Sequence, residues 1–501
     1  MNRRHSRRRF LQFTAGMAGY FLTAPAASAR RAAEKPNETL RFAGIGVGGK
    51  GSSDIDQAGK LGMVVALCDI DERTLAAKGA QFPSAAKFFD FRKMFDDLGR
   101  QIDAVTVSTP DHTHAVACML AMKAKKHVYC QKPLTHTVLE ARRLRETAAQ
   151  MGVATQMGNQ GSASSGLRRA VEVVQAGVIG PVREAHVWTN RPGAYWKQAP
   201  HVVSRPPESP IPAHVHWDEF IGPAPMRPYA DFEEKRKDRR TGAEITDRRG
   251  WYHPFLWRGW WDFGTGALGD MACHTANMAF RALKLGYPTS VVADATDVNP
   301  ETYPSSARVT FQFPARGDMP PATFVWYEGR RNGRHVLPDP ALVKGQRKRD
   351  GALSVYFDNG QWRYFNPQEP DPKKQDQVVS SGSFLVGDKG VLFSPNDYGS
   401  NALIITEDGV ERVTGQPERL PINDKDDDGM KIEWVEAIRG GPAPYSSFDF
   451  AALLTETILL GNVAIRFNGE RLEWDGPAMK FTNKPDANPL LHKEYRSGWT
   501  L

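Results

Sequence analysis

The feature that most constrains the fold is a glycine-rich turn that follows an apolar run near the N-terminus. The run is Leu40–Ile45, and the turn reads Gly46-Val47-Gly48-Gly49-Lys50-Gly51 before a helical stretch. In this context Gly-x-Gly-x-x-Gly is the dinucleotide-binding fingerprint, because the glycines allow a tight turn and let the backbone approach a pyrophosphate at the helix N-terminus. We therefore assign cofactor binding to the four glycines Gly46, Gly48, Gly49 and Gly51.

Apolar strands and helical stretches alternate from residue 40 to about residue 160. The predicted strands are 40–45, 63–68, 104–108, 127–130 and 153–156. The predicted helices are 52–58, 72–78, 91–98, 114–124 and 138–151, and Thr135 is the expected cap of the last. This alternation predicts an α/β fold whose first domain, over 40–160, is a doubly wound parallel sheet of the Rossmann type.

The regular alternation of strands and helices ends at about residue 160, and we predict a second domain over 161–501. Helices are expected at 167–176, from about 268, and at 450–465, with strands at 183–189, 290–298, 307–313 and 322–327. Segments 190–250, 330–380 and 414–428 are rich in charge, proline or glycine and are expected to be loops. The pattern predicts an α+β domain with a largely antiparallel open sheet, and no further segment that spans a bilayer.

The first 29 residues have the three parts of a cleaved export signal. A basic run contains Ser6-Arg7-Arg8-Arg9-Phe10-Leu11, a weakly apolar stretch follows, and Ala27-Ser28-Ala29 forms a cleavage site. The alternative is a basic disordered tail. The twin-arginine pattern predicts export of an already folded protein to the periplasm or another extracytoplasmic space, with no stable membrane anchor and with 30–39 as a linker.

Charge and cysteine content narrow the function further. The formal net charge is +8, but five of the 65 basic residues lie in the signal, which leaves 60 basic against 57 acidic residues. Nucleic acid is therefore not an expected partner. The four scattered cysteines form no Cys-x-x-Cys pair and are expected to be buried free thiols rather than zinc ligands or disulfides.

An acidic residue supports the fingerprint. Asp69 ends the second predicted strand, 18 residues after Gly51. A carboxylate at this place accepts the ribose hydroxyls of NAD and repels the 2′-phosphate of NADP. NAD is therefore the expected cofactor, while the nearby Arg73 leaves NADP open.

Two further strand ends face the same crevice. The first strand end is followed by Thr109-Pro110-Asp111-His112-Thr113-His114. Either histidine of this run could contact the cofactor. Alternatively, Asp111 or Thr113 only caps the next helix. We assign Thr109, Pro110, His114 and Lys132 to the cofactor site. Lys132 follows the next strand, where a lysine polarises a substrate hydroxyl, and Pro133 favours a cis peptide.

The stretch 251–274 carries the third candidate group. Asp270 and His274 lie four residues apart on a predicted helix and therefore on one face, where the carboxylate can orient the imidazole as a general base. The alternative is a salt-bridged surface helix. The aromatic residues of the stretch are either packed core or platforms for sugar rings. No third ligand is evident, so we expect no metal site.

Together these motifs resemble the Gfo/Idh/MocA family of NAD(P)-dependent oxidoreductases. The resemblance rests on the fingerprint, Asp69, Thr109-Pro110, Lys132-Pro133, the Asp-x-x-x-His segment ending at His274, and Leu459-Leu460-Gly461-Asn462. It implies a Lys–Asp–His catalytic group at Lys132, Asp270 and His274, and a homo-oligomer. The family's usual Glu-Lys-Pro reads Gln131-Lys132-Pro133 here, so residue 131 cannot neutralise the lysine.

The resemblance implies an oxidoreductase that acts on a secondary hydroxyl of a small-molecule sugar or cyclitol. Because nicotinamide cofactors are made in the cytoplasm, an exported enzyme is expected to carry tightly bound NAD and to recycle it. The alternative is a redox-neutral glycoside hydrolase or lyase that works by transient oxidation and elimination. A third class, a sugar-binding protein without turnover, would not need Lys132 or His274.

Overall fold

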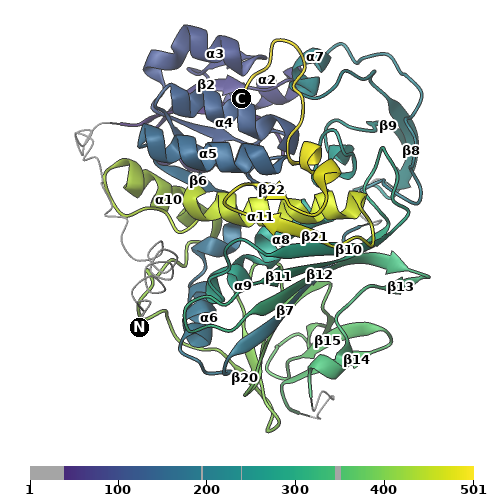
Figure 1. Cartoon of the computed structure of the whole chain (residues 1–501). Coiled ribbons are helices and arrows are strands. Elements are labelled where there is room, and N and C mark those ends of the chain that lie inside the picture. The colour runs from purple at the N-terminus through teal and green to yellow at the C-terminus, as the bar shows by residue number, and fades with distance from the viewer. Residues whose placement is uncertain (1–38, 193–195, 238–239, 345–350) are drawn as a thin grey trace, which may run out of the picture. The chain divides into compact units, whose positions relative to one another are not determined.

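A computed structural model describes residues 39–192, 196–237, 240–344 and 351–501 (Figure 1). The predicted export signal and most of the 30–39 linker lie outside these residues. Within the described part, two sheets dominate. The first is fully parallel, and the second is mixed but mostly antiparallel, as the sequence predicts.

The parallel sheet has the strand order β3-β2-β1-β4-β5-β6. Its strands are β1 (Arg41–Ile45), β2 (Met63–Cys68), β3 (Ala86–Phe88), β4 (Ala104–Val107), β5 (His127–Cys130) and β6 (Thr155–Met157). Its helices are α1 (Lys50–Gly59), α2 (Glu72–Gln81), α3 (Phe91–Leu98), α4 (Asp111–Lys123) and α5 (Val138–Met151). The order reverses at β1 and β4, and ligands bind at such a switch point, outside the carboxyl ends of the strands.

The cap of α5 differs from the prediction. Thr137, not Thr135, is the N-cap: its hydroxyl accepts the Glu140 N–H, and the Glu140 carboxylate accepts the Thr137 N–H at 2.9 Å. This reciprocal pair is a capping box, so the spacing Thr-x-x-Glu was the signal to use. The Thr135 hydroxyl instead donates to the Thr137 carbonyl at 3.0 Å.

The second sheet has the order β20-β19-β18-β17-β7-β12-β11-β10-β21-β22, with β13 paired to β12. Its strands are β7 (Val182–Thr189), β10 (Ser290–Thr296), β11 (Ser306–Phe313), β12 (Ala322–Arg331), β13 (Arg334–His335), β17 (Ser381–Gly387), β18 (Val391–Ser394), β19 (Leu403–Ile405), β20 (Val410–Arg412), β21 (Leu472–Asp475) and β22 (Lys480–Phe481). The helices that follow the Rossmann part of the chain are α6 (Ser165–Gln175), α8 (Gly266–Thr275), α9 (Asn277–Ala282), α10 (Asp426–Ile438) and α11 (Phe448–Arg466). Of these, α10 packs on the first sheet, beside α1 and against β5 and β6.

The segments expected to be loops contain regular structure. Within 190–250 lie the short helix α7 (Trp217–Ile221) and a hairpin of β8 (Asp231–Lys237) and β9 (Glu244–Gly250). Within 330–380 a small sheet forms from β14 (Ser354–Asp358), β15 (Gln361–Phe365) and β16 (Asp376–Val378). Both loop predictions were wrong. In the hairpin, charged residues dominate and mask the alternation of a strand. The small sheet packs on the second sheet through Trp362, a contact between segments that are distant in the sequence.

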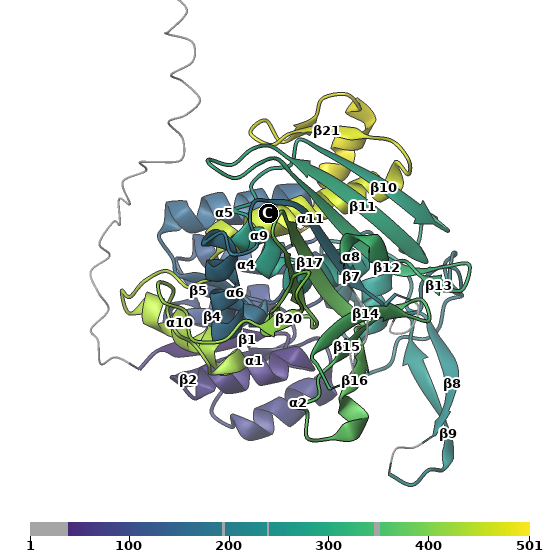
Figure 2. The ribbon, with the colours of Figure 1, turned by 90° about the horizontal axis from the view of Figure 1, so that it is seen from below.

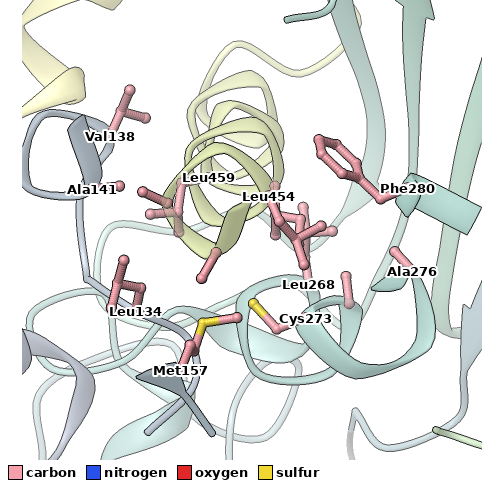
Figure 3. Close-up of a cluster of buried hydrophobic side chains, with 14 of the residues drawn as sticks. Leu134, Val138, Ala141, Met157, Leu268, Cys273, Ala276, Phe280, Leu454 and Leu459 are labelled. Atoms are coloured by element: carbon pink, nitrogen blue, oxygen red, sulfur yellow. The ribbon is translucent and has the colours of Figure 1, made fainter. Parts of the chain in front are cut away.

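Helix α11 joins the two sheets. Figure 3 shows it between Leu134, Val138 and Met157 of the Rossmann half and Leu268 and Cys273 of α8. By length and composition α11 also fits a membrane span, contrary to our expectation that no such segment follows the signal. In the folded chain 83% of its most apolar window is buried, so it serves here as a core helix. Cys68, Cys118, Cys130 and Cys273 are all buried and free, as predicted.

Candidate active site

The glycine turn connects β1 to α1 and holds its shape only with glycines. Gly46 has φ +75°, and a Cβ there would lie 2.8 Å from the Ser108 carbonyl group. A Cβ on Gly51 would lie 1.9 Å from the Gly46 oxygen, so α1 can pack this closely only without a side chain at that position. Gly46, Gly48 and Gly49 line a cleft above the sheet, while Gly51 shapes the turn beneath it.

Asp69 lies where the prediction placed it, at the end of β2 and in the wall of the same cleft. Its carboxylate accepts backbone N–H groups from Val47 at 2.8 Å and from Asp71 at 3.0 Å, which fixes it beside the glycine turn. Burial raises its pKa, although these N–H groups oppose the shift. Arg73 pairs with Asp71 at 3.3 Å, so this arginine is engaged by another carboxylate.

Thr109 and Pro110 also line the cleft, but His114 does not. The His114 ring is 1% exposed and lies 2.8 Å from both the Pro133 and the Thr109 carbonyl oxygens. Burial lowers its pKa to about 4. The prediction that His114 binds cofactor directly was wrong, because its position on α4 turns the ring into the protein, where it braces the two turns that carry Thr109 and Lys132.

Lys132 and Asp270 meet across the cleft as an ion pair. Lys132 follows β5, and its peptide bond to Pro133 is cis, as predicted. The Lys132 ammonium donates to Asp270 Oδ1 at 2.7 Å and to the Asp270 carbonyl at 3.0 Å, while Arg258 Nε donates to the same Oδ1 at 3.3 Å. Burial alone would raise the Asp270 pKa, but these two cations outweigh it and hold the pKa well below its usual range.

His274 lies one helical turn beyond Asp270 on α8 and lines the same end of the cleft. Burial, and then Lys132, lower its pKa well below the usual value, so the ring is neutral near neutral pH. Its ring meets Tyr398 edge to face, with the ring centroids 5.1 Å apart. The expected hydrogen bond from the His274 ring to the Asp270 carboxylate is not formed among the described residues: His274 Nδ1 has no partner, and Asp270 Oδ1 accepts from the charged donors Lys132 and Arg258 instead.

A buried carboxylate that the sequence analysis missed lies beneath the catalytic turn. Asp54 on α1 accepts hydrogen bonds from Gln131 Nε2 and Ser108 Oγ, both at 2.8 Å. It also pairs with the ammonium groups of Lys50 and Lys431, both at 2.6 Å. Gln131 therefore acts as a donor toward Asp54, while the charge of Lys132 is balanced by Asp270 across the cleft.

The aromatic residues of 251–263 divide between core and cleft. Tyr252, Trp260 and Phe263 are packed in a buried cluster, which confirms the core interpretation for them. Phe255 and Trp257 line the cleft, and the Arg258 guanidinium lies over both rings, 4.6 and 4.1 Å from their centroids.

The cleft fits a dinucleotide. Its volume is about 660 Å³, and its wall runs from Asp69 past the glycine turn to Lys132, Asp270 and His274. Two buried polar atoms of wall residues, Asp111 Oδ1 and His274 Nδ1, have no hydrogen-bond partner among the described residues. Buried polar atoms are normally paired, so these two atoms suit a bound ligand. The residues that would hold NAD are thus present and correctly placed.

Fold and cleft together define a two-domain protein with a Rossmann cofactor domain. Residues 40–159 match the oxidoreductase family model with the NAD-binding Rossmann fold, and residues 165–316 match the family's C-terminal alpha/beta domain. The chain belongs to the Gfo/Idh/MocA family.

Curated relatives match in part. An inositol 2-dehydrogenase of Salmonella typhimurium is 27% identical over 153 residues, which cover 30% of this chain and 45% of that protein. A glycosyl hydrolase family 109 protein of Solibacter usitatus is 32% identical over 125 residues, 23% of this chain and 28% of that protein. The match therefore spans less than half of each relative.

Solved structures share the fold over more of the chain. An inositol dehydrogenase homolog from Azotobacter vinelandii, complexed with NADH and myo-inositol, superposes with a TM-score of 0.54 at 14% identity, covering 87% of this chain and 98% of its own. The WlbA dehydrogenase from Bordetella pertussis, in complex with NADH and UDP-GlcNAcA, gives 0.54 at 14% identity, covering 87% and 99%.

Proposed function

We propose that this protein is an NAD-dependent oxidoreductase that acts on a secondary hydroxyl of a sugar or cyclitol. The observation that carries the proposal is one cleft with a dinucleotide cradle at one end and the Lys132–Asp270 pair with His274 at the other. The partial relatives include an inositol 2-dehydrogenase, which supports a polyhydroxylated substrate.

Each catalytic side chain has a distinct task. Lys132 holds the substrate oxygen and stabilises negative charge on it, and Asp270 fixes the ammonium in place. His274 takes the hydroxyl proton, for which its lowered pKa keeps the ring neutral. Bound NAD would supply the acceptor for the hydride that leaves the carbon bearing this hydroxyl.

We further propose export by the twin-arginine route, assembly as a homo-oligomer, and NAD that stays bound and is recycled within turnover. The twin-arginine pattern in residues 1–29 supports export and bound NAD, since a twin-arginine substrate folds, and can load its cofactor, before it leaves the cytoplasm. The homo-oligomer rests on the family alone.

A redox-neutral glycoside hydrolase is the second candidate, and the partial match to a glycosyl hydrolase family 109 protein favours it. In this reaction oxidation at C3 acidifies the C2 proton, elimination breaks the glycosidic bond, water adds to the resulting alkene, and the hydride returns to C3. The same Lys132 and His274 would serve these proton transfers.

The test follows aglycone release and NADH absorbance in parallel, with aryl glycosides, free sugars and inositols as substrates. An oxidised sugar or inositol as product, with NADH absorbance on the enzyme and no aglycone release, supports the oxidoreductase. Aglycone release without an oxidised product or net NADH supports the hydrolase. We expect His274→Asn and Lys132→Met to lower kcat by about 10²–10⁴-fold while NAD stays bound. The control is His335→Ala on β13, outside the cleft. Unchanged turnover in both site variants would contradict the assignment.

A further inference from the structure

The adenosine end of the cleft is closed by segments from outside the Rossmann domain. Asp69 marks this end because it meets the adenosine ribose, and Ile70, Phe89 and Phe91 continue the wall beyond it. Three later parts of the chain complete the wall with Glu219 and Phe220, with His253 beside Phe220, and with Trp499 near the C-terminus.

Residues 214–222 dock on the end of β2. His216 N–H donates to the Ile70 carbonyl and Glu72 N–H donates to the His214 carbonyl, both at 2.9 Å. The His216 ring stacks on Phe89 with 3.8 Å between the ring centroids. This segment therefore holds the strand end that follows Asp69.

The C-terminal residues 493–499 fasten this segment to the Rossmann domain. Arg496 pairs with Asp218 on α7, and its Nε donates to the Gly222 carbonyl at 3.0 Å. At the start of the tail, the buried ammonium of Lys493 donates to the His112 carbonyl at 3.1 Å and lies 3.5 Å from Glu140. In Figure 1 the yellow C-terminal segment passes α7 and ends on the Rossmann half.

Trp499 is the tail residue that reaches the cleft. It is 8% exposed, its ring centroid lies 5.8 Å from that of Phe91, and the Arg92 guanidinium lies 4.1 Å above it. A buried tryptophan with Arg92 over its ring and Phe91 beside it has lost most of its freedom before any ligand binds, so it presents a pre-organised apolar wall.

We propose that residues 214–222 and 493–499 form a cofactor clamp, in which Trp499 lines the adenine pocket and Arg496 locks the tail to α7. Release of NAD from the closed cleft then requires the clamp to open. The clamp gives the chain its own means of keeping NAD bound through export and repeated turnovers. This inference rests on the proposed function, since it assumes NAD in the cleft.

The test measures NAD dissociation, not activity. The folded protein is loaded with radiolabelled NAD, freed of excess by gel filtration, and challenged with unlabelled NAD. We expect Trp499→Ala and Arg496→Gln to release label about tenfold or more faster than wild type. Trp474→Ala is the matched control, since Trp474 is 6% exposed, packs on Phe481 and lies outside the cleft wall.

The possible outcomes separate the two proposals. Release that is equally fast in wild type, both clamp variants and the control overturns the clamp and leaves the proposed function standing. A folded wild-type protein that neither carries NAD when purified nor takes it up overturns the proposed function and the clamp with it. Thermal unfolding of each variant confirms that faster release comes from a folded protein.

Discussion

Asp111 is a buried carboxyl group in the cleft wall, at the first turn of α4. The Thr265 hydroxyl donates to its Oδ2 at 2.7 Å, and its Oδ1 has no partner among the described residues. Burial, and then the charge of Asp270, raise its pKa to about 7. A carboxyl with a raised pKa binds more protons in the folded than in the unfolded chain, so its contribution to stability is present at low pH and lost as pH rises through about 4 to 7.

We therefore predict that Asp111→Asn is more stable than wild type at pH 8, on the order of 2–4 kcal/mol, and nearly equal to it at pH 4. The amide oxygen can still accept from Thr265, so the hydrogen bond is retained. Thermal unfolding from pH 4 to 8 measures the difference. Asp97→Asn, at an exposed position on α3, is the control. A parallel pH dependence of Asp111→Asn and wild type would contradict the prediction.

A single contact accounts for Gln131 at the position where the family usually has glutamate. The side chain of Gln131 meets the carboxylate of Asp54, so a glutamate would place two buried carboxylates within 3 Å of each other. The sequence alone showed only that Gln131 lacks the negative charge that the family's glutamate places next to the lysine. Its role as a donor depends on α1 and β5 being adjacent, which no local pattern shows.

Helix α10 was not predicted from the sequence, yet it supplies a buried charge beneath the site. It brings Lys431 against Asp54 at 2.6 Å, and both side chains are fully buried. Replacing either partner leaves the other buried charge less well paired. We predict that Lys431→Met and Asp54→Asn each lower stability and that a double-mutant cycle gives a coupling energy of about 1–3 kcal/mol.

The pair Lys60–Asp428 supplies the matched control for this cycle. It joins the same two elements, the end of α1 and α10, at 3.1 Å, but its side chains are 64% and 45% exposed. An exposed pair couples by at most about 1 kcal/mol. Equal coupling in the two cycles, measured by denaturant unfolding, would show that burial of Lys431 has no special role.

Elements with a clear period were predictable, and elements decided by distant contacts were not. The bounds predicted for β2, β5, α3 and α5 are those of the structure, because apolar runs and helical stripes mark them locally. For α10 the acidic run Asp426–Asp428 suggested a loop, although Met430, Trp434 and Ile438 have helical spacing. Acidic residues in the first turn in fact favour a helix there.

The candidate site was predictable to a similar extent. Strand ends of a parallel sheet meet at one edge, so the positions of Asp69, Thr109 and Lys132 followed from the alternation alone. The contact between Lys132 and Asp270 joins the two domains and rested on resemblance. The direction of the His114 ring, the Asp54 network and the tail at Trp499 depend on packing between distant segments, which the sequence does not reveal.

At the scale of the whole molecule, the two domains share one cofactor cleft. Figure 2 shows α10 of the later chain beside α1 and the first strands, while the second sheet lies across from them. The Rossmann domain supplies Asp69, the glycine turn and Lys132, and the second domain supplies Asp270, His274 and the clamp. We therefore expect binding, chemistry and retention of the cofactor to depend on both domains together.

The most direct test of this proposal is the NAD(H) content of the protein purified from the extracytoplasmic space to which the twin-arginine pattern is predicted to send it. We predict a stoichiometric amount of NAD(H) that survives gel filtration and dissociates only slowly from the folded protein. Asp69→Ala should lower this content, because the carboxylate that holds the ribose is lost. An empty cleft that exchanges NAD freely would contradict the bound-cofactor reading.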